Sequence, residues 1–458
     1  MKVSILLFTP VLLLSVSLSA QSPDKGWQNL FNGKDLSGWK RAGGIAEFSV
    51  ENGVITGRTV MNTRNTFLIT EKEYGDFILE LDAWVEDEEG NAGVQTRSHL
   101  DPAAFNGEGR VYGRQCEIDP TPRRWTGGIY DEGRREWLYP MQLNAAAQNA
   151  YKKGVYNHIR IECIGNEMRT WVNGTAAAYL VDTINEKGFI GLQVHSINSA
   201  DHQGKKVCYK NIRIKTTGLT PTPFPANVYV ANLVPNSLTA YEKRNGWRLL
   251  FDGNTSKGWK SAKGNSFPEK GWAIHHGVLS VLASEGSEST NGGDIVTNEQ
   301  FAAFDLSFEF KLTPGANSGV KYFVTLAEQS SGSAIGLEYQ VLDDTLHPDA
   351  KLGREGNRTL ASLYDLIKAE KQKRFLRPTG QWNCGRIIVY PNDKVEHYLN
   401  GIKVLEYIRG SKQYRDLVAI SKYVTWKNFG EAPKGHILLQ DHGNAVSYRS
   451  IKVRELNP

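Results

Sequence analysis

The chain has 458 residues, of which 40% are apolar and 22% are charged, and these fractions exclude an intrinsically disordered protein. The formal net charge of +5 is small for this length, so we expect neither a nucleic-acid partner nor attachment to a membrane surface. The length predicts two or three domains, each large enough to bury its own core.

The chain begins with a short apolar segment. Lys2 precedes an apolar stretch at Val3–Leu14, and small residues follow up to Ala20. This pattern is typical of a secretory signal peptide, and the stretch is too short to serve as a membrane anchor. We therefore predict a signal peptide at residues 1–20 and a bacterial protein that is periplasmic or secreted.

The rest of the chain contains one sequence pattern twice. The motif Gly-Trp-x-x-Leu-Phe-Asn/Asp-Gly begins at Gly26 and again at Gly246, and further matches follow both copies in the same order. Collinear matches at this long spacing indicate two homologous domains. We place these domains at residues 21–215 and 244–458, joined by a Pro- and Thr-containing linker at 216–243 that we expect to be extended.

Alternation of apolar and polar residues predicts β-strands in both copies, for example at 77–85 and 304–312. Asn-Gly pairs between such segments are typical of β-hairpin turns. Helix is expected only at Ala361–Arg374 and Lys412–Lys422. Each copy is therefore predicted to be all-β, a two-sheet sandwich of jelly-roll type. The spacing of the matches also places about 20 extra residues of the second copy in Arg409–Lys434.

The four cysteines show neither a C-x-x-C pair nor the spacing of a metal finger. We expect Cys116, Cys163, Cys208 and Cys384 to be small buried residues. A disulfide between two of the first three remains open, because an exported protein meets an oxidising compartment.

Motifs of four common enzyme classes are missing. The sequence has no G-x-S-x-G, no H-E-x-x-H, no P-loop and no G-x-G-x-x-G after a strand. Serine hydrolase, zinc protease, kinase and dinucleotide chemistry therefore lose their usual support. Acids, histidines and aromatic residues near strand ends remain as candidates.

One predicted strand in each copy carries acid and amide side chains on one face. In the first copy these are Gln115, Glu117 and Asp119; in the second, Glu338 and Gln340 have the acid and amide exchanged. A carboxylate beside a neutral amide suits a general base next to a hydrogen-bonding group for a polyhydroxy ligand. The exposed polar face of an edge strand is the alternative.

Two histidines and two cations are further candidates. His195 and His442 occupy matching positions at a strand end, where a solvated or capping residue is the alternative. Arg97 and Lys321 follow the Asn-x-Gly-Val motif of their copies. Both are candidates for substrate binding, and a surface charge is the alternative for Arg97.

Aromatic residues are concentrated in one loop of the first copy. Trp125, Tyr130 and Trp137 are candidates for stacking on sugar rings, with core packing as an equal explanation.

Asp343 is a candidate for binding substrate. Together with Asp344 and His347 it could also hold a divalent cation through oxygen and imidazole ligands, and solvated loop acids are the alternative. We expect no other cofactor.

Several motifs in combination resemble the 3-keto-disaccharide hydrolase family, which is also described as a 3-keto-glucoside 1,2-lyase/glucal hydratase family. They are the repeated opening, Asn317-Ser-Gly-Val320, Gly336-Leu-Glu-Tyr-Gln-Val-Leu-Asp-Asp344, Leu363-Tyr-Asp365 and Leu439-Gln-Asp-His-Gly443. The resemblance covers both copies. It implies tandem concanavalin-like jelly rolls and a small carbohydrate as the partner.

The resemblance also implies a reaction. A base removes the proton at C2 of a 3-keto-glycoside, the C1 substituent leaves, and water adds to the enone. This chemistry needs a base, a positive or hydrogen-donating group at the enolate oxygen, and an acid for the leaving oxygen. The residues matched to these roles are Glu117 and Glu338 as bases, His195 and His442 as acid or enolate stabiliser, and Tyr130 and Tyr364 as hydrogen-bond donors.

The second copy keeps the family pattern more fully, because the first has Val194-His195-Ser196 where the second has Asp-His-Gly. One domain is therefore expected to bind while the other reacts. Two other functions remain open: a non-catalytic, lectin-like binding protein, and a conventional glycosidase with paired acids roughly 5–9.5 Å apart in a cleft.

Overall fold

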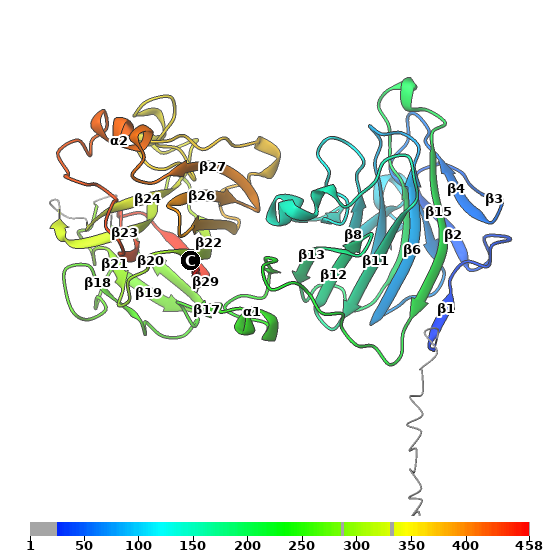
Figure 1. The fold of residues 1–458 in the computed structure, drawn as a ribbon, viewed down its shortest axis with the longest axis horizontal. Coiled ribbons are helices and arrows are strands. Elements are labelled where there is room, and N and C mark those ends of the chain that lie inside the picture. Colours follow the sequence, from blue (N-terminus) through cyan, green and yellow to red (C-terminus); the bar gives the residue numbers. More distant parts are fainter. Residues whose placement is uncertain (1–24, 285–287, 330–333, 458) are drawn as a thin grey trace, which may run out of the picture.

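The computed structural model describes residues 25–284, 288–329 and 334–457, so the predicted signal peptide lies outside the described residues. These residues form two β-sandwiches, which Figure 1 shows side by side. The prediction of two tandem jelly-roll sandwiches is confirmed. Within the described residues, no helix has the length and apolar character needed to cross a membrane.

The first sandwich consists of two mainly antiparallel sheets. One contains, in spatial order, β16 (Ala231–Asn232), β13 (Thr175–Val181), β12 (Glu167–Val172), β11 (Asn157–Ile164), β6 (Phe77–Val85), β15 (Lys206–Lys215), β4 (Val54–Arg58) and β3 (Phe48–Glu51), with β1 (Trp27–Asn29) paired to β15. The other contains β10 (Glu136–Tyr139), β9 (Ile129–Glu132), β8 (Arg110–Ile118), β7 (Ala92–Asp101), β14 (Phe189–Val194), β5 (Thr66–Thr70) and β2 (Trp39–Gly43).

The second sandwich repeats this order from the opposite edge of each sheet, but its described residues form no strands that correspond to β16, β9 and β10. Its larger sheet contains β19 (Trp272–His275), β20 (Val278–Val281), β29 (Val446–Glu455), β22 (Phe304–Leu312), β25 (Asn383–Val389), β26 (Lys394–Leu399) and β27 (Ile402–Ile408), with β17 (Arg248–Leu249) paired to β29. Its smaller sheet contains β18 (Trp259–Ser261), β21 (Ile295–Thr297), β28 (His436–Leu439), β23 (Asn317–Gln329) and β24 (Ala334–Leu342).

The Asn-Gly pairs form the predicted tight hairpins. Asn52, Asn173 and Asn400 all have positive φ angles, of 52°, 49° and 50°, and each is followed by a glycine with positive φ. Two successive residues with positive φ are the requirement of a type I′ turn, which asparagine and glycine meet with the least strain. These turns fix the register of the β3–β4, β12–β13 and β26–β27 hairpins.

Only one of the two predicted helices forms. The helix expected at Lys412–Lys422 is α2 (Lys412–Ala419), which begins after the capping residue Ser411. The helix expected at Ala361–Arg374 is wrong, because Leu363 instead makes strand-like bridges to Tyr339 and Ile367. Within the predicted range, the only helical residues belong to the short 3₁₀ segment Lys373–Phe375. The other 3₁₀ segments of the described chain are Ala104–Gly107, Met141–Asn149, Ala200–His202 and Pro348–Lys351.

The linker packs against the first sandwich instead of hanging free. Its Pro-rich part forms neither helix nor strand, β16 then joins β13 in parallel, and α1 (Ala240–Arg244) follows with a capping box made by Thr239 and Glu242. A helix at this place was not predicted.

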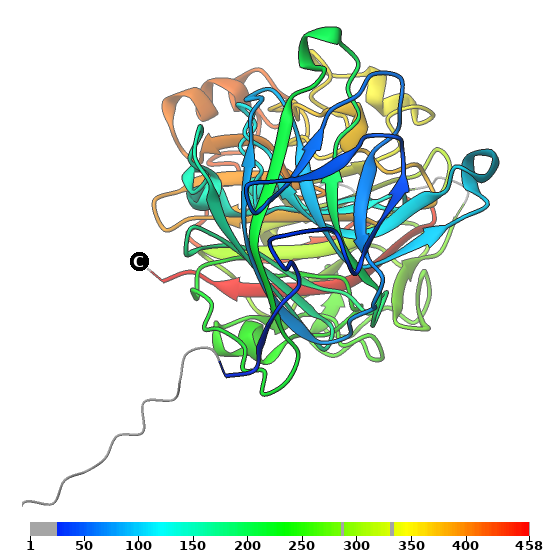
Figure 2. The same cartoon turned by 90° about the vertical axis from the view of Figure 1, so that its right-hand side faces the viewer.

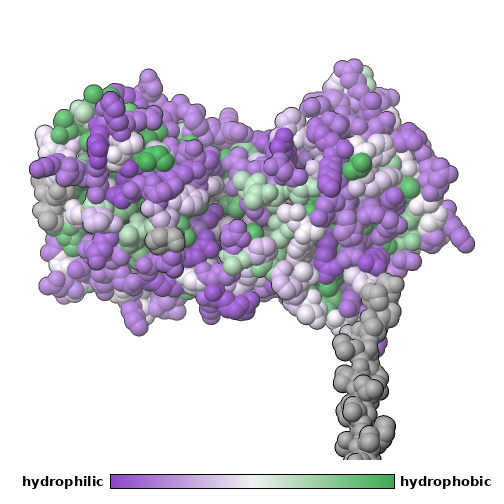
Figure 3. Space-filling model, in the orientation of Figure 1, coloured by the Kyte–Doolittle hydropathy of each residue, from purple (hydrophilic) through white to green (hydrophobic). Residues whose placement is uncertain are grey.

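The two sandwiches contact each other directly. The backbone N–H of Lys403 donates to Gln142 Oε1 at 2.9 Å, and the rings of Phe375 and Trp125 lie 5.7 Å apart. Figure 2 views the molecule from the side of the first sandwich, with the second behind it, and Figure 3 shows paler, more apolar residues where the two meet on an otherwise mainly hydrophilic face.

All four cysteines are free in the structure. Cys116, Cys163 and Cys208 are buried, as expected of small apolar residues, and Cys384 is partly buried. The disulfide that the sequence left open between two of the first three does not form.

Candidate active site

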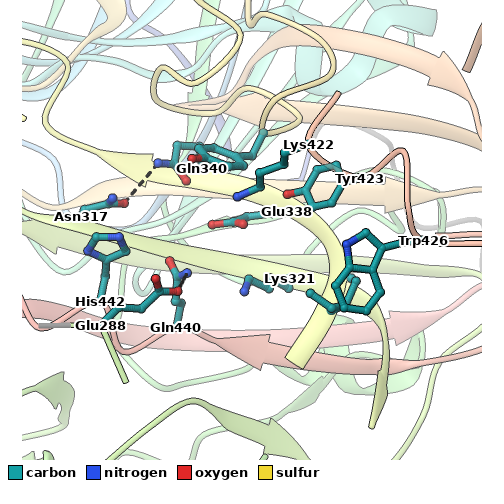
Figure 4. A pocket seen from close by; sticks show the side chains of 13 residues that line it. Glu288, Asn317, Lys321, Glu338, Gln340, Lys422, Tyr423, Trp426, Gln440 and His442 are labelled. Carbon is teal, nitrogen blue, oxygen red and sulfur yellow. Dashed lines mark hydrogen bonds between the residues drawn. The ribbon is translucent and has the colours of Figure 1, made fainter. Parts of the chain in front are cut away.

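A cavity of about 250 Å³ lies on the smaller sheet of the second sandwich, and Figure 4 shows it from close by. We call it the second cavity. Strands β23 and β24, the loop after β28 and the segment after α2 supply most of its wall. It is lined by Glu288, Asn317, Lys321, Ile335, Gly336, Glu338, Gln340, Tyr364, Lys422, Tyr423, Trp426, Gln440 and His442.

The alternation of β24 points Glu338 and Gln340 to the cavity, while Leu337, Tyr339 and Val341 join the core. Glu338 and Gln340 are only 5% and 1% exposed, so the alternative of an exposed polar face is wrong.

The glycine of the Asn-Ser-Gly-Val motif makes room for Glu338. A Cβ atom at Gly319 would lie 2.2 Å from Glu338 Oε1, which is closer than the two atoms can approach. Lys321, two residues further along β23, is the direct cross-strand partner of Glu338.

The carboxyl group of Glu338 is buried and lies between two ammonium groups in Figure 4. Burial raises the pKa of Glu338, and the positive charges of Lys321 and Lys422 act in the opposite direction. Lys321 is itself only 4% exposed, and its Nζ atom lies 4.0 Å from an oxygen of Asp294. The cavity therefore holds a buried acid among compensating cations.

Lys422, Tyr423 and Trp426 belong to the segment that the first copy lacks. The backbone N–H of Lys422 donates to Asp365 at 2.8 Å, which fixes the segment against the loop that carries Tyr364. Taken over the whole residue, Lys422 is exposed to solvent. Its Nζ atom nevertheless lies 4.2 Å from the centre of the Tyr364 ring, and burial of the ammonium group by the surrounding protein lowers its pKa.

Tyr364 is held by charged neighbours. Its hydroxyl donates to Asp349 at 2.8 Å, and Arg358 bridges Asp349 and Asp365 at 3.0 and 2.8 Å. Burial, and then the charge of Glu338, raise the pKa of Tyr364. The hydroxyl is therefore a protonated hydrogen-bond donor at neutral pH.

Three buried polar atoms of this wall have no hydrogen-bond partner in the described structure: Gln340 Oε1, Gln440 Oε1 and His442 Nδ1. The amide nitrogen of Gln340 is occupied, because it donates to Asn317 at 3.1 Å. Asp441 orients the motif by accepting the N–H groups of Gly293 and Gly443 at 2.9 and 3.0 Å. Buried polar atoms normally have partners, so this wall is suited to a polar ligand.

The first sandwich has a cavity of about 230 Å³ at the equivalent place. We call it the first cavity. It is lined by Asn65, Asn91, Gln115, Glu117, Arg123, Tyr130, Glu132, Trp137, Gln193, His195 and one residue of the second sandwich, Arg374.

The two cavities differ in the position of their acid. Gln115 lies opposite Gln95 across β7 and β8, as Glu338 lies opposite Lys321 across β23 and β24. The structural counterpart of Glu338 is therefore Gln115, and the first cavity carries its acid two residues later, at Glu117.

Glu117 lies among hydrogen-bond donors. Asn91 donates to it at 2.5 Å, Gln115 at 3.0 Å, and Arg123 lies 3.5 Å away. Burial outweighs these contacts and raises the pKa of Glu117 to about 7.

Two further candidates line the first cavity near Glu117. His195 donates from Nδ1 to the Ser196 carbonyl at 2.6 Å, and burial lowers its pKa, so its ring is neutral at neutral pH. Tyr130 packs against Trp137 with ring centres 5.3 Å apart, and its pKa is raised to about 12, mainly by burial.

Three candidates of the first copy lie outside both cavities. Arg97 is 1% exposed and contacts Asp76 at 2.8 Å, so it is neither at the cavity nor a surface charge. Asp119 is buried and binds Arg123 at 2.6 Å, so it positions a cavity residue without facing the cavity. Trp125 is buried in the core beneath Trp137.

The candidate cation ligands of the second copy do not converge. Asp343 accepts the N–H groups of Gly315 and Thr345, Asp344 binds Lys371 at 2.6 Å, and His347 caps the turn at Asp349. Among the described residues, no group of three or more acids, histidines or cysteines could hold a metal ion.

Sequence reasoning missed Lys422, Tyr423 and Trp426, although the extra length of the second copy at this place was a usable signal. It also missed Glu288, Asn317 and Gln440 as lining residues. Asn317 and Gln440 lie within motifs that the sequence singled out, but nothing in their spacing showed that they meet at one cavity.

Comparisons with known proteins agree with this repeated architecture. The family model described as 3-keto-alpha-glucoside-1,2-lyase-like domain matches residues 26–215 and again 246–454. A curated protein of Bacteroides thetaiotaomicron named 3-keto-disaccharide hydrolase is 37% identical over 233 residues, which cover 46% of this chain and 79% of that protein.

Among solved structures, a candidate glycosyl hydrolase of Parabacteroides distasonis is 30% identical with a TM-score of 0.42, and the match covers 49% of this chain and 100% of that one. The carbohydrate-binding module CBM66 of Bacillus subtilis is 14% identical with a TM-score of 0.27, and covers 39% and 95%. Because the family model matches most of the described chain in two successive copies, this protein belongs to the 3-keto-α-glucoside-1,2-lyase-like domain family.

Proposed function

We propose that this protein cleaves 3-keto-glycosides and that the second cavity performs the reaction. The proposal is supported by family membership and by one observation above all, the buried carboxyl of Glu338 facing Lys321 and Lys422. A ketone at C3 acidifies the C2 hydrogen, because the resulting carbanion delocalises onto the ketone oxygen as an enolate. A base beside fixed positive charge is the arrangement that such a step needs.

Glu338 is the proposed base. A raised pKa makes its carboxylate a stronger base, and the two lysines favour the ionised form that must accept the proton. Lys422 stabilises the negative oxygen of the enolate, since its ammonium reaches the cavity from a segment that packs over it. The base thus lies on β24, and the group that stabilises the enolate lies on the segment after α2.

The C1 oxygen leaves with a proton from the His442 imidazole, which lines the cavity with Glu338. The Tyr364 hydroxyl already donates its one proton to Asp349 and orients the cavity wall. Water then adds to the enone, so that elimination and hydration together hydrolyse the glycosidic bond. The unpartnered atoms of Gln340 and Gln440 bind sugar hydroxyls, and Trp426 offers a ring face for stacking. The predicted signal peptide supports action outside the cytoplasm.

The test is to incubate the protein with a 3-keto-glucoside and with its unoxidised parent, and to follow aglycone release and deuterium exchange at C2. We expect both only with the keto substrate. Glu338→Gln should lower kcat by about 10²-fold or more, since the amide cannot accept the proton. Glu406→Gln, at an exposed site on β27, is the matched control and should retain wild-type kcat.

Three outcomes would overturn the proposal. Equal release from the parent glycoside indicates a conventional glycosidase. Saturable binding without release indicates a lectin-like protein. Aglycone release by Glu338→Gln at the wild-type rate removes Glu338 from the role of base.

A further inference from the structure

A larger cavity, of about 640 Å³, lies where the two sandwiches meet, and the proposed reaction does not use it. The loop between β9 and β10 forms one wall, and the segment around Lys373–Phe375 forms the other. We call it the junction groove. It shares Trp137 and Arg374 with the first cavity, so the two spaces adjoin.

The junction groove is rich in positive charge. Arg134 and Arg135 lie in one wall and both contact Asp131, at 2.6 and 2.5 Å, and Arg135 also contacts Asp182 at 2.7 Å. Glu136 adds one acid to this wall. The opposite wall presents three more cations, Lys373, Arg374 and Arg377. In the part of the chain that the structure describes, none of these three forms an ion pair.

The first cavity, by contrast, is balanced in charge: Glu117 and Glu132 line it with Arg123 and Arg374, and Arg123 already contacts Asp119 at 2.6 Å and Glu117 at 3.5 Å. The excess of positive charge therefore lies in the junction groove, at Lys373, Arg374 and Arg377. Like charges that face a common space repel each other, and an anion placed among them relieves this repulsion. Guanidinium groups match carboxylate and sulfate oxygens with paired hydrogen bonds.

A third cavity adjoins the first. It has a volume of about 400 Å³ and shares Asn91 and His195 with the first cavity. Three adjoining cavities suit a ligand of more than one sugar unit. Within the first cavity, Asn91 Oδ1 and Gln193 Nε2 are buried without a hydrogen-bond partner in the described structure, and Trp137 offers a half-buried ring.

We propose that the first cavity and the junction groove bind an acidic oligosaccharide, with the anionic group of one sugar held in the groove by Arg374 beside Lys373 and Arg377. The anionic group is a uronate carboxylate or a sulfate ester, which share this chemistry. Asn91 and Gln193 bind hydroxyls, and the aromatic face of Trp137 supports the next ring. The site is incomplete without the second sandwich, because Arg374 comes from it. It is independent of the reaction proposed for the second cavity.

The test compares three disaccharides on the full-length protein by calorimetry: cellobiose, the same disaccharide with its terminal glucose oxidised to glucuronate, and cellobiose 6-sulfate. We expect at least one acidic form to bind at least tenfold more tightly than cellobiose, with a preference that falls as salt rises. The uronate and sulfate arms identify which anion is taken.

Arg374→Gln should abolish the preference for the acidic sugar and leave turnover of a 3-keto-glucoside unchanged, because Arg374 lies outside the second cavity. Arg244→Gln, at an exposed site of α1, removes the same charge elsewhere and should keep the preference. Equal affinity for acidic and neutral forms, or a preference that survives Arg374→Gln, would overturn the proposal.

Discussion

The two cavities occupy the same place on the same fold, but they do not carry the same chemistry. In the second, Glu338 faces the cation Lys321 across two strands; in the first, the amides Gln115 and Gln95 occupy these positions. The acid of the first cavity is Glu117, which meets Asn91, Gln115 and Arg123. An acid held by two amides and an arginine is placed to bind, whereas an acid among lysines is placed to move a proton.

The covers of the two cavities differ as well. The second is covered by a segment of its own sandwich, which brings Lys422 and Trp426. The first has no such segment and is completed by Arg374, from the other sandwich. Duplication thus kept the sheets and changed what lies over them. A cavity closed by its own sandwich works alone, while one closed by a neighbour depends on the junction.

The largest expected difference between the copies is in how activity responds to one methyl group added at the glycine of the Asn-x-Gly-Val motif. Gly319→Ala would place a Cβ atom 2.2 Å from Glu338 Oε1, and because that oxygen ends a flexible side chain, the chain can swing away without unfolding the sheet. We expect kcat on a 3-keto-glucoside to fall by about 10²-fold or more, since misplacing a reacting group by 1 Å has such an effect. Steady-state kinetics measure kcat, and a thermal melt shows whether the variant remains folded.

Gly93→Ala is the equivalent change in the first sandwich, where the new Cβ would lie 2.2 Å from the side-chain Cδ of Gln115. We expect its kcat to remain within twofold of wild type. Equal losses in both variants would show that both cavities react, and would end the division of roles drawn here.

A smaller effect is expected from the segment that only the second copy has. Lys422→Met removes a positive charge that lowers the pKa of Glu338 and that stabilises the enolate. We expect kcat to fall by about 10²-fold or less. A base acts only when ionised, so activity is lost as pH falls through its pKa, and burial already holds the pKa of Glu338 above its ordinary value. The acid limb of the kcat/KM profile should therefore move to higher pH in Lys422→Met.

Lys427→Met is the matched control, because Lys427 is an exposed lysine of the same segment and does not line the cavity. Its pH profile should coincide with that of wild type. A drop in kcat without a shift of the acid limb would mean that Lys422 does not act on the ionisation of the base.

The sequence was sufficient for those parts of the site that follow from local periodicity. The alternation of a single strand placed Glu338 and Gln340 on one face, and the structure has them so. Arg97 was misplaced because β7 contains a bulge between Thr96 and His99, where Arg97 adopts a φ of 47°. A bulge breaks the period of two, and the side chain then reaches Asp76 instead of the cavity.

Other parts depend on contacts that are distant in sequence. The apolar pattern after Ala361 resembles a helix, but Ala361 and Asp365 have positive φ angles, and Leu363 pairs with Tyr339 of β24. Tertiary pairing overrides helix propensity here. The position of Trp426 over the second cavity, and of Arg374 in the first, follows from how whole segments fold back, which no local pattern encodes.

The smallest expected effect is a pH dependence of the stability that Glu117 gives to the first sandwich. Burial raises the pKa of Glu117 to about 7, so the folded protein binds this proton more tightly than the unfolded chain. The stabilisation is fully present below the unfolded pKa of 4.5 and is lost as pH rises through about 7, a loss of at most about 3 kcal/mol.

Glu117→Gln keeps the shape of the side chain but removes its titratable proton. We expect its free energy of unfolding to exceed that of wild type at pH 8 and to match it at pH 5, measured by denaturant titration of the full chain. Glu47→Gln, at an exposed site of the first sandwich, should show no such pH-dependent difference. If Glu117→Gln tracked wild type at both pH values, the acid of the first cavity would lie in water, and its role as a buried binding group would fail with it.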